Sequence, residues 1–411
     1  MAFILITVVL DATGIGLLVP VLPRLIGELA GVDITRAAVY GGWITALFAT
    51  VQFLAAPLLG NLSDRFGRRP VLLASLAAFG LNYLLMGFAS SLAWLFVAQA
   101  IAGLCGATVA TAGAYLADIS TVGNRARHFG MMGGAFSFGF VVGPVLGGLL
   151  GGQHLRLPIF VAAGLAILNV VYGWFVLPES LRREHRRPFS LARAHVLGMA
   201  RHMSRDPLLF RLLGGLLLMM IANQTLPATW PYFTMHKLGW TAQDIGYSLG
   251  AYGLLGIAAQ AWVIPTLNAR FGLRGTATIG LGLGILSLVG FAFAPSAPFV
   301  WACVVPSALG FVAWPAINGI MSAKTPREAQ GELQGAIASV QSLAAIVTPL
   351  VMPRVFSLFA GAQAPVYFPG AAFLLAALLL AASLVVVRRV TRGLVLHGVA
   401  PLRTRGGHGA H

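Results

Sequence analysis

The chain has 411 residues, of which 58% are hydrophobic and only 9% charged, and its formal net charge is +16. Soluble domains carry about 25% charged residues, so this composition excludes an ordinary soluble protein. Apolar stretches of about 20 residues recur along the whole chain, and each is long enough to cross about 30 Å of hydrocarbon as a helix. The stretches are continuously apolar rather than alternating, which excludes a β-barrel.

Polar residues divide the apolar sequence into twelve predicted transmembrane helices, in two sets of six. We therefore predict an all-α integral membrane protein with two six-helix bundles, at 1–177 and 208–387. A cytoplasmic linker at 178–207 joins them, and a basic tail follows at 388–411. The twelve spans are predicted at 2–22, 40–60, 70–89, 92–117, 128–150, 157–177, 208–233, 245–267, 275–294, 298–321, 333–356 and 366–387.

The first span has a single charged residue, Asp11, in its middle. A carboxylate inside a membrane span costs about 2.5–3.5 kcal/mol on insertion scales, so its presence needs an explanation. No basic stretch precedes the apolar run, and the run exceeds the usual core of a signal peptide. We therefore expect a mature helix here.

The loop after the second span reads GNLSDRFGRRP, from Gly60 to Pro70. Its glycines allow close approach and sharp turns at helix ends. Its acid, Asp64, and its arginines can form charge-assisted hydrogen bonds there. Pro70 suits the first turn of the third span. The simplest alternative is that the arginines only anchor the membrane topology.

The fifth span is rich in glycine and contains one proline. Small residues at helical spacing allow two helices to contact each other backbone to backbone, and proline bends a helix and frees backbone groups. Ordinary tight helix packing is the alternative explanation. The pattern G-x8-G-x3-G-P-x2-G-G is matched by Gly130, Gly139, Gly143, Pro144, Gly147 and Gly148.

The basic residues fall mainly on one side of the predicted membrane. One alternate set of loops, with the C-terminal tail, holds 22 of the 27 Lys and Arg residues. The positive-inside rule then places both termini and the linker in the cytoplasm. This distribution explains the net charge without nucleic-acid binding, which we do not expect.

A short internal repeat supports the division into two halves. Arg65-Phe66-Gly67 follows the second span, and Arg270-Phe271-Gly272 follows the eighth span 205 residues later. Two similar halves around a central path are a typical arrangement of transporters.

The loop at 60–70 resembles the conserved loop of the major facilitator superfamily. The glycine pattern of the fifth span is similar to the antiporter signature of its drug exporters. Segments at 10–23, 51–73, 111–120, 125–134, 143–152, 177–180 and 331–335 resemble the tetracycline efflux pumps. This resemblance implies export of a drug in exchange for a proton, with the proton gradient as energy source and no bound cofactor. It also implies a substrate that travels as a chelate with a divalent metal.

The same resemblance implies a cytoplasmic gate that holds the two halves together when the protein faces outward. Its predicted residues are Gly60, Asp64, Arg65, Gly67, Arg68, Arg69, Asp118, Arg125 and Arg127. This chain differs from the family at several positions. Gln99 replaces an arginine, and Asn82 replaces an aspartate. The histidine and the aspartate that the family carries in spans eight and nine fall near Gly256 and Gly284 of this chain. Replacing both members of a buried ion pair by neutral residues leaves no charge without a partner. Asn82 and Gln99 can therefore form a hydrogen bond with each other or with a ligand.

Asp11 is the leading candidate for proton coupling. Apart from Asp118 near a helix end, it is the only acid within the first six spans, and the last six contain none at depth. Burial away from water disfavours a charged carboxylate. Asp11 can therefore bind a proton when it is buried and release it when it contacts water. The structural alternative is that Asp11 caps a neighbouring helix or lines water.

Amide and hydroxyl groups inside the spans are candidates for a drug path, because they orient neutral or cationic ligands without a buried charge. Each can equally serve as a contact between helices. The candidates are Gln52, Asn82, Gln99, Tyr115, Asn223, Gln224, Gln260 and Asn318.

Other classes of protein are less well supported. No Walker or Rossmann glycine motif is present, and no Cys/His cluster has metal-ligand spacing. We expect no enzyme, no metal site and no obligate protein partner. The expected partners are a small drug, protons and the lipid of the inner (cytoplasmic) membrane. An exporter of another drug or metabolite, or a metabolite symporter, remains the alternative.

Overall fold

The computed structural model describes residues 1–106, 108–121, 123–181, 184, 186, 207–326 and 329–392. Every extended regular element within these ranges is a helix. The helices are α1 (Ala2–Leu18), α2 (Leu22–Ala30), α3 (Ile34–Phe66), α4 (Arg68–Gly87), α5 (Leu92–Cys105), α6 (Thr108–Asp118), α7 (Arg125–Gln153), α8 (Leu157–Val176), α10 (Pro207–Leu238), α11 (Ala242–Ala258), the π-helix η3 (Ala259–Val263), α12 (Ile264–Phe293), α13 (Ala297–Gly310), α14 (Ala313–Lys324), α15 (Gln330–Ala360) and α16 (Ala371–Thr391).

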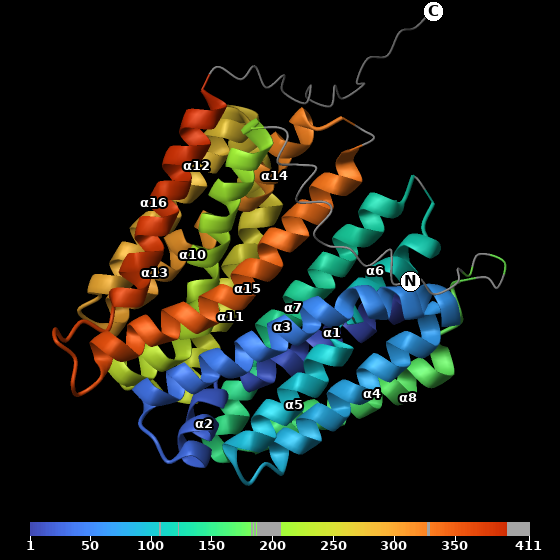
Figure 1. The fold of residues 1–411 in the computed structure, drawn as a ribbon, viewed down its shortest axis with the longest axis horizontal. Helices are drawn as coiled ribbons and strands as arrows, with labels where there is room; N and C mark the ends of the chain where they lie inside the picture. Colours follow the sequence, from blue (N-terminus) through green and yellow to red (C-terminus); the bar gives the residue numbers. More distant parts are fainter. Residues whose placement is uncertain are drawn as a thin grey trace, which may run out of the picture.

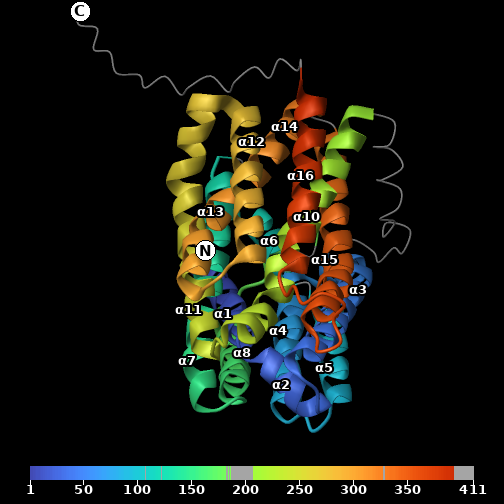
Figure 2. The same ribbon diagram turned by 90° about the vertical axis from the view of Figure 1, so that its left-hand side faces the viewer.

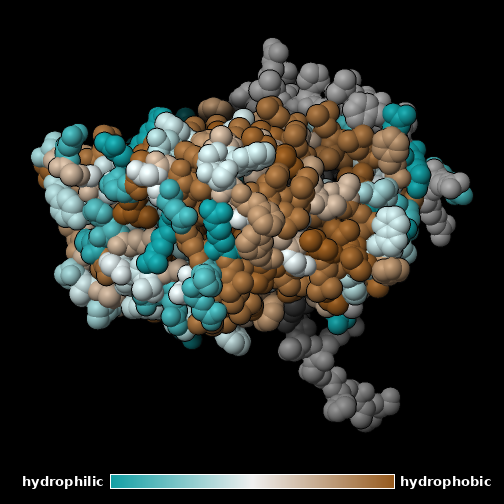
Figure 3. Space-filling view, turned by 90° about the horizontal axis from the view of Figure 1, so that it is seen from below, coloured by the Kyte–Doolittle hydropathy of each residue, from teal (hydrophilic) through white to brown (hydrophobic). Residues whose placement is uncertain are grey.

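Large apolar side chains cover much of the outer surface. Phe175 is 81% exposed, Phe88 74% and Trp262 72%. Figure 3 shows a broad hydrophobic area on one face of the molecule. Water-soluble monomers rarely expose apolar patches of this extent, so this surface fits a lipid environment.

In the described part of the chain, nine helices are long and apolar enough to cross a membrane, or ten if the bent pair α1 and α2 is one span. The predicted twelve spans are reached only if the continuous helix at 242–293 is divided at Gly272 and the short α5 is counted with α6. The chain is therefore an all-helical, multi-pass membrane protein, and the number twelve stays a prediction.

The helices form two groups in space. The first helical group, α1–α8, and the second helical group, α10–α16, make most of their contacts internally. Figure 1 shows their helices inclined to each other, and Figure 2 shows the second group above the first. The predicted linker falls between the groups, but residues 187–206 lie outside the described residues, as does the tail from 393 onward.

Several predicted spans are not single straight helices. The span predicted at 92–117 is divided into α5 and α6 near Gly106, and the one at 298–321 is divided into α13 and α14. The Gln52 amide of α3 donates to the Gly106 carbonyl at 2.7 Å, which satisfies a backbone group freed by the first break. Hydropathy does not reveal such breaks, because the sequence stays apolar across them.

The two halves of the sequence repeat share an uncommon backbone conformation. Gly67 has φ 109° and ψ 161°, and Gly272 has φ 65° and ψ 178°. Positive φ with extended ψ is essentially restricted to glycine. Each glycine follows Arg-Phe and turns the chain between two long helices, so the sequence repeat is also a structural one.

Candidate functional site

The two helical groups meet along two seams at one end of the molecule, which we name the closed end. In the first seam, α7 lies against α11: a Cβ added to Gly148 would lie 2.5 Å from the Ala242 carbonyl oxygen, and Gly246 backs directly onto the Pro144 carbonyl. In the second seam, α3 lies against α15, and Gly42 backs onto the Pro349 carbonyl. Glycine permits these backbone contacts because it has no side chain.

Aromatic residues strengthen the second seam. The Arg354 guanidinium lies 5.6 Å from the centre of the Trp43 ring, a cation–π distance. The Tyr232 hydroxyl contacts Gly41. These pairs join α3 of the first group to α15 and α10 of the second.

The groups separate toward the opposite end, which carries Gly67 and Gly272 and which we name the open end. Along α7, the contact with α11 continues as far as Val141, whose side chain meets Gly253. Two turns further, Gly134 lies on the same face of α7, but nothing lies within 4 Å of its Cβ position. Phe138 is 56% exposed between them. The structure is therefore closed at one end and parted at the other.

Asp11 lies in α1, which packs against the glycine-rich α7 and against α8, and which Tyr83 of α4 meets at Gly14. It is half-buried. Among the residues that the structure describes, no basic side chain forms an ion pair with it. The Tyr83 hydroxyl lies 3.3 Å from the Cβ position of Gly14, one turn along α1. Asp11 is thus an unpaired acid in an apolar bundle.

The predicted antiporter motif of α7 serves two packing faces. Gly139, Gly143 and Gly147 contact the backbone of α1 at Val9, Thr13 and Leu17, respectively. Pro144 and Gly148 instead form the seam with α11. The motif therefore sets the position of α1, with Asp11, relative to the second helical group. Gly130 has nothing within 4 Å and belongs to neither face.

The predicted gate residues converge around Arg68 at the open end. Its guanidinium binds Asp64 at 2.7 Å and Asp118 at 3.1 Å, and it also donates to Ser63. Ser180 donates to the same Asp118 oxygen at 3.2 Å. The cluster joins α3, α4, α6 and the segment after α8, all of the first helical group.

Glu179 is a member of this cluster that the sequence did not reveal. Its carboxylate accepts the backbone N–H groups of Arg68 at 2.9 Å and Arg69 at 3.3 Å, at the start of α4. A negative charge there complements the helix dipole and the unpaired N–H groups. Gly67 packs against this carboxylate, so its lack of a side chain also makes room for Glu179. The segment LPES was singled out in the sequence, but without a role for Glu179.

The remaining gate residues have separate contacts. Arg69 donates to the Trp174 carbonyl at 2.6 Å, and Arg125 donates to the Ala117 carbonyl at 3.5 Å. Arg65 lies over the Phe66 ring, and Arg127 is exposed. Gly60 has nothing within 4 Å. Of these described contacts, none reaches the second helical group, as expected where the groups are parted.

The predicted drug-path residues of the first group do not form one site. The Gln52 amide donates to the Gly106 carbonyl at the break between α5 and α6, and the Tyr115 hydroxyl donates to the Pro178 carbonyl at 3.2 Å. Gln99 points its amide at the Met86 sulfur, 3.9 Å away. The Asn82 oxygen is buried without a protein partner. Of the two possibilities for Asn82 and Gln99, a bond to each other or to a ligand, the first is not formed in this structure.

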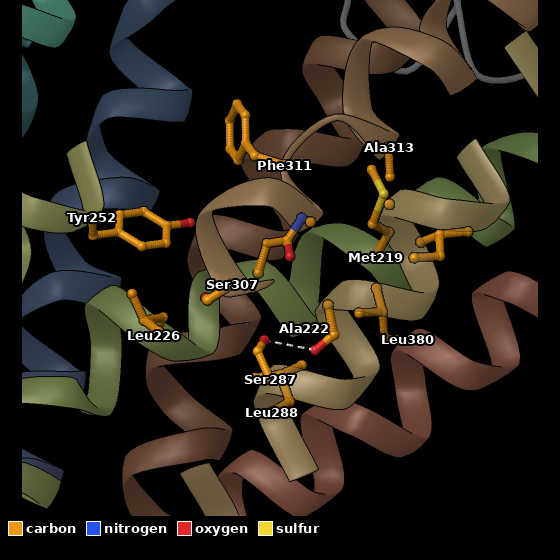
Figure 4. A pocket seen from close by; sticks show the side chains of 15 residues that line it. Met219, Ala222, Leu226, Tyr252, Ser287, Leu288, Ser307, Phe311, Ala313 and Leu380 are labelled. Atoms are coloured by element: carbon orange, nitrogen blue, oxygen red, sulfur yellow. Dashed lines mark hydrogen bonds between the residues drawn. The ribbon is translucent and has the colours of Figure 1, made fainter. Parts of the chain in front are cut away.

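In the second helical group, Asn223 lines a small pocket between α10, α11, α12, α13, α14 and α16, part of which is open to solvent. Tyr252 and Ser307 both line it, and Ser287 donates to the Gly284 carbonyl. Figure 4 shows Tyr252 pointing toward the helix of Ser307. The other lining residues are mainly apolar, such as Met219 and Phe311. This uncharged lining suits an amphipathic ligand.

The other predicted path residues of the second group lie outside this pocket. Gln260 is exposed within η3, and Gln224 and Asn318 are partly buried. Among the described residues, no group of three or more His, Cys, Asp or Glu side chains could hold a metal ion.

Comparison with known proteins identifies the family. The sequence profile of the Major Facilitator Superfamily matches residues 4–349. The chain is 39% identical over 351 residues to the class C tetracycline resistance protein of Escherichia coli, covering 85% of this chain and 88% of that protein. It is 33% identical over 387 residues to the class H protein of Pasteurella multocida, covering 93% and 94%.

Solved structures show the same fold. The human organic anion transporter MFSD10 matches with a TM-score of 0.70 at 23% identity, covering 94% of this chain and 98% of that one. The nucleoside transporter NupG (D323A mutant) matches with a TM-score of 0.77 at 13% identity, covering 95% and 99%. The chain therefore belongs to the Major Facilitator Superfamily, as a multi-pass membrane transporter of a small molecule and not an enzyme.

Proposed function

We propose that this transporter exports tetracycline or a related amphipathic drug from the cell in exchange for protons. The names of its relatives, the tetracycline resistance proteins of classes C and H, support the drug. The lone acid Asp11 supports proton coupling, because it lies unpaired in an apolar bundle beside the seam helix α7. That placement is the observation that carries the mechanism.

The proposed topology places the protein in the inner membrane with the open end in the cytoplasm. The arginines of the gate cluster lie at this end, and cytoplasmic loops are rich in Lys and Arg. Both ends of the chain and the linker are then cytoplasmic. In this orientation, drug enters from the cytoplasm between the parted helical groups.

Transport follows by alternating access, in which the two groups rock about their contacts. The seams at Gly148 and Gly42 close the outer end in the inward-open state described here. The gate cluster around Arg68 is proposed to bind the second group when the inner end closes. Drug and proton must favour different states for the two movements to be coupled. Asp11 fulfils this condition if its contact with water differs between the states.

The substrate is proposed to travel as a complex with a divalent cation, as the resemblance to the tetracycline pumps implies. The replacements at Asn82 and Gln99 remove charges at two positions of the path. An exporter of another drug or metabolite, or a metabolite symporter, is the alternative.

The test uses everted membrane vesicles that contain the full-length protein, with the cytoplasmic face outward. Tetracycline with Mg²⁺ is added to vesicles without a proton gradient, and the pH of the medium is recorded. Antiport moves drug inward and protons outward, so the medium acidifies. Alkalinisation would indicate symport. No response to tetracycline, with acidification by another drug in a panel, would overturn the substrate but keep the antiport mechanism.

A further inference from the structure

Two buried polar side chains where α1 meets α8, one helical turn before Asp11, lack partners for their oxygen atoms. The Asn169 amide of α8 donates to the Thr7 carbonyl of α1 at 3.1 Å. The Asn169 Oδ1 and the Thr7 Oγ1 are both buried, and neither has a hydrogen-bond partner among the described residues. Both residues have 0% exposure. A buried polar atom without a partner costs about 1–3 kcal/mol, so a partner is expected here.

The Thr7 hydroxyl departs from the usual behaviour of helical threonines in this protein. Thr45, Thr225 and Thr276 each donate to the carbonyl four residues earlier in their own helix. The Thr7 hydroxyl makes no such bond. It is therefore available as both donor and acceptor toward a group outside α1.

The two free oxygens belong to residues that already touch, yet they do not bond each other. A bridging water is the ordinary solution to such a gap, since one water can donate to one oxygen and accept from the other. Buried waters typically make about three hydrogen bonds, which leaves one for a third group.

Asp11 is placed to be that third group. Thr7, Asp11 and Gly14 are spaced i, i+4 and i+7, so they lie on one face of α1. This face contacts Asn169 of α8 at Thr7 and Tyr83 of α4 at Gly14. Helical side chains lean toward the N-terminus of their helix, which directs the Asp11 carboxyl over the turn that contains Thr7.

We propose that a water molecule bound between Thr7 Oγ1 and Asn169 Oδ1 is the group that exchanges protons with Asp11. This inference rests on the proposed role of Asp11 in proton coupling. On release, the O–H bond of the Asp11 carboxylic acid breaks and the water gains the proton as hydronium. The hydronium then passes the proton to solvent, and loading of Asp11 is the reverse. Thr7 and Asn169 act as positioning residues, because they hold the water.

The neighbours of this site fit the proposal. On α4, Asn82 is 2% exposed and its oxygen also lacks a protein partner, while Tyr83 is 4% exposed. Next to Thr7 along α1, Ile4 and Val8 belong to an apolar cluster. A water held beside Thr7 is isolated from the lipid.

The first test is structural and needs no variant. A crystal structure of the full-length protein that resolves ordered water should show a water within hydrogen-bond distance of both Thr7 Oγ1 and Asn169 Oδ1. A direct hydrogen bond between these two atoms, or no water between them, would overturn the proposal.

The second test separates proton transfer from drug movement. Thr7→Val removes the hydroxyl at nearly constant volume, Thr7→Ser keeps it, and Thr234→Val is the control, because that buried hydroxyl already bonds its own helix. A positioned proton-transfer group contributes about 10²–10⁴-fold. Thr7→Val should lower drug-driven proton movement at least about tenfold, while exchange of labelled for unlabelled drug stays within about twofold. Thr7→Ser and Thr234→Val should behave like the wild type.

Asp11→Asn distinguishes the inference from the function on which it rests. If Asp11→Asn stops proton movement and Thr7→Val does not change it, the water site is wrong and the role of Asp11 stands. If Asp11→Asn itself couples normally, the proposed role of Asp11 fails, and the water site fails with it.

Discussion

Gly67 and Gly272 lie 205 residues apart, yet both have positive φ with extended ψ and both follow Arg-Phe. They differ in their surroundings. A Cβ at Gly67 would collide with the Glu179 carboxylate, whereas nothing lies within 4 Å of the Cβ position of Gly272. Both turns thus need a residue that adopts positive φ, but only at Gly67 is there also no room for a side chain.

This difference predicts unequal effects of alanine at the two turns. Both Gly67→Ala and Gly272→Ala place a side chain in a conformation that costs about 1–3 kcal/mol. Gly67→Ala must in addition displace Glu179, so it should lower the thermal midpoint of the purified protein further. Gly164→Ala, in α8 with open space around it, is the control. Equal effects of the first two variants would show that the collision with Glu179 is unimportant.

Arg68 should be coupled more strongly to Asp118 than to Asp64. The Asp64 side chain is 40% exposed, and exposed ion pairs contribute about 0.2–1 kcal/mol. The Asp118 side chain is only 24% exposed, and it lies at the end of another helix, α6. Double-mutant cycles with Arg68→Gln, Asp118→Asn and Asp64→Asn measure both couplings by unfolding in detergent. We expect a coupling energy of about 0.5–3 kcal/mol for the Asp118 pair. A larger coupling to Asp64 would contradict the geometry.

Glu179 should stabilise the start of α4 by its charge and by its hydrogen bonds. Glu179→Gln keeps an acceptor oxygen but removes the charge, and Glu179→Ala removes both. Stability should fall in that order, by about 1 kcal/mol for alanine, as for a lost helix cap. Thermal unfolding measures this stability, with Glu184→Ala, at an exposed acid five residues later, as control. If glutamine and alanine at 179 both match the wild type, the contacts to Arg68 and Arg69 contribute nothing.

A larger side chain at Gly148 should push α7 and α11 apart at their seam and so shift the protein away from the inward-open state. Gly148→Val forces the backbone of α7 away from Ala242, and overpacking of this kind costs about 1–3 kcal/mol. Such a cost changes the ratio of the two states about 5–150-fold. Gly152→Val, with nothing within 4 Å, is the control.

The change in the ratio of the two states is measured by the labelling rate of a cysteine introduced at the open end. Gly134→Cys is introduced after Cys105→Ser and Cys303→Ser, and its labelling by a water-soluble thiol reagent is timed. Labelling should slow in the Gly148→Val background, because closing of the open end covers position 134. Equal labelling rates in the Gly148→Val and Gly152→Val backgrounds would show that the α7–α11 seam does not set the state.

The sequence predicted the main features of the fold because they follow from local patterns. Apolar length predicts membrane helices, and the motif at 60–70 places Asp64 and Arg68 at one helix end, where they do bond. The repeat of Arg-Phe-Gly predicted that Gly67 and Gly272 are equivalent positions, and their backbone angles agree.

What the sequence did not predict depends on contacts between distant helices. Glu179 caps a helix that starts 111 residues earlier, and Asn169 bonds a carbonyl 162 residues away. No periodicity links such positions, because each helix has several polar residues and several possible neighbours. The breaks in the spans at 92–117 and 298–321 were also missed, since an apolar sequence gives no sign of a turn whose backbone groups are satisfied by a remote side chain such as Gln52.

Drug-driven proton movement by Asp11→Asn tests whether Asp11 couples protons to drug export. Glu28→Gln is the matched control, since Glu28 is an exposed acid that forms a long ion pair of 3.7 Å with Arg156. In everted vesicles with tetracycline and Mg²⁺, the wild type and Glu28→Gln should acidify the medium, and Asp11→Asn should not, although it still exchanges labelled drug. Normal acidification by Asp11→Asn would contradict the account.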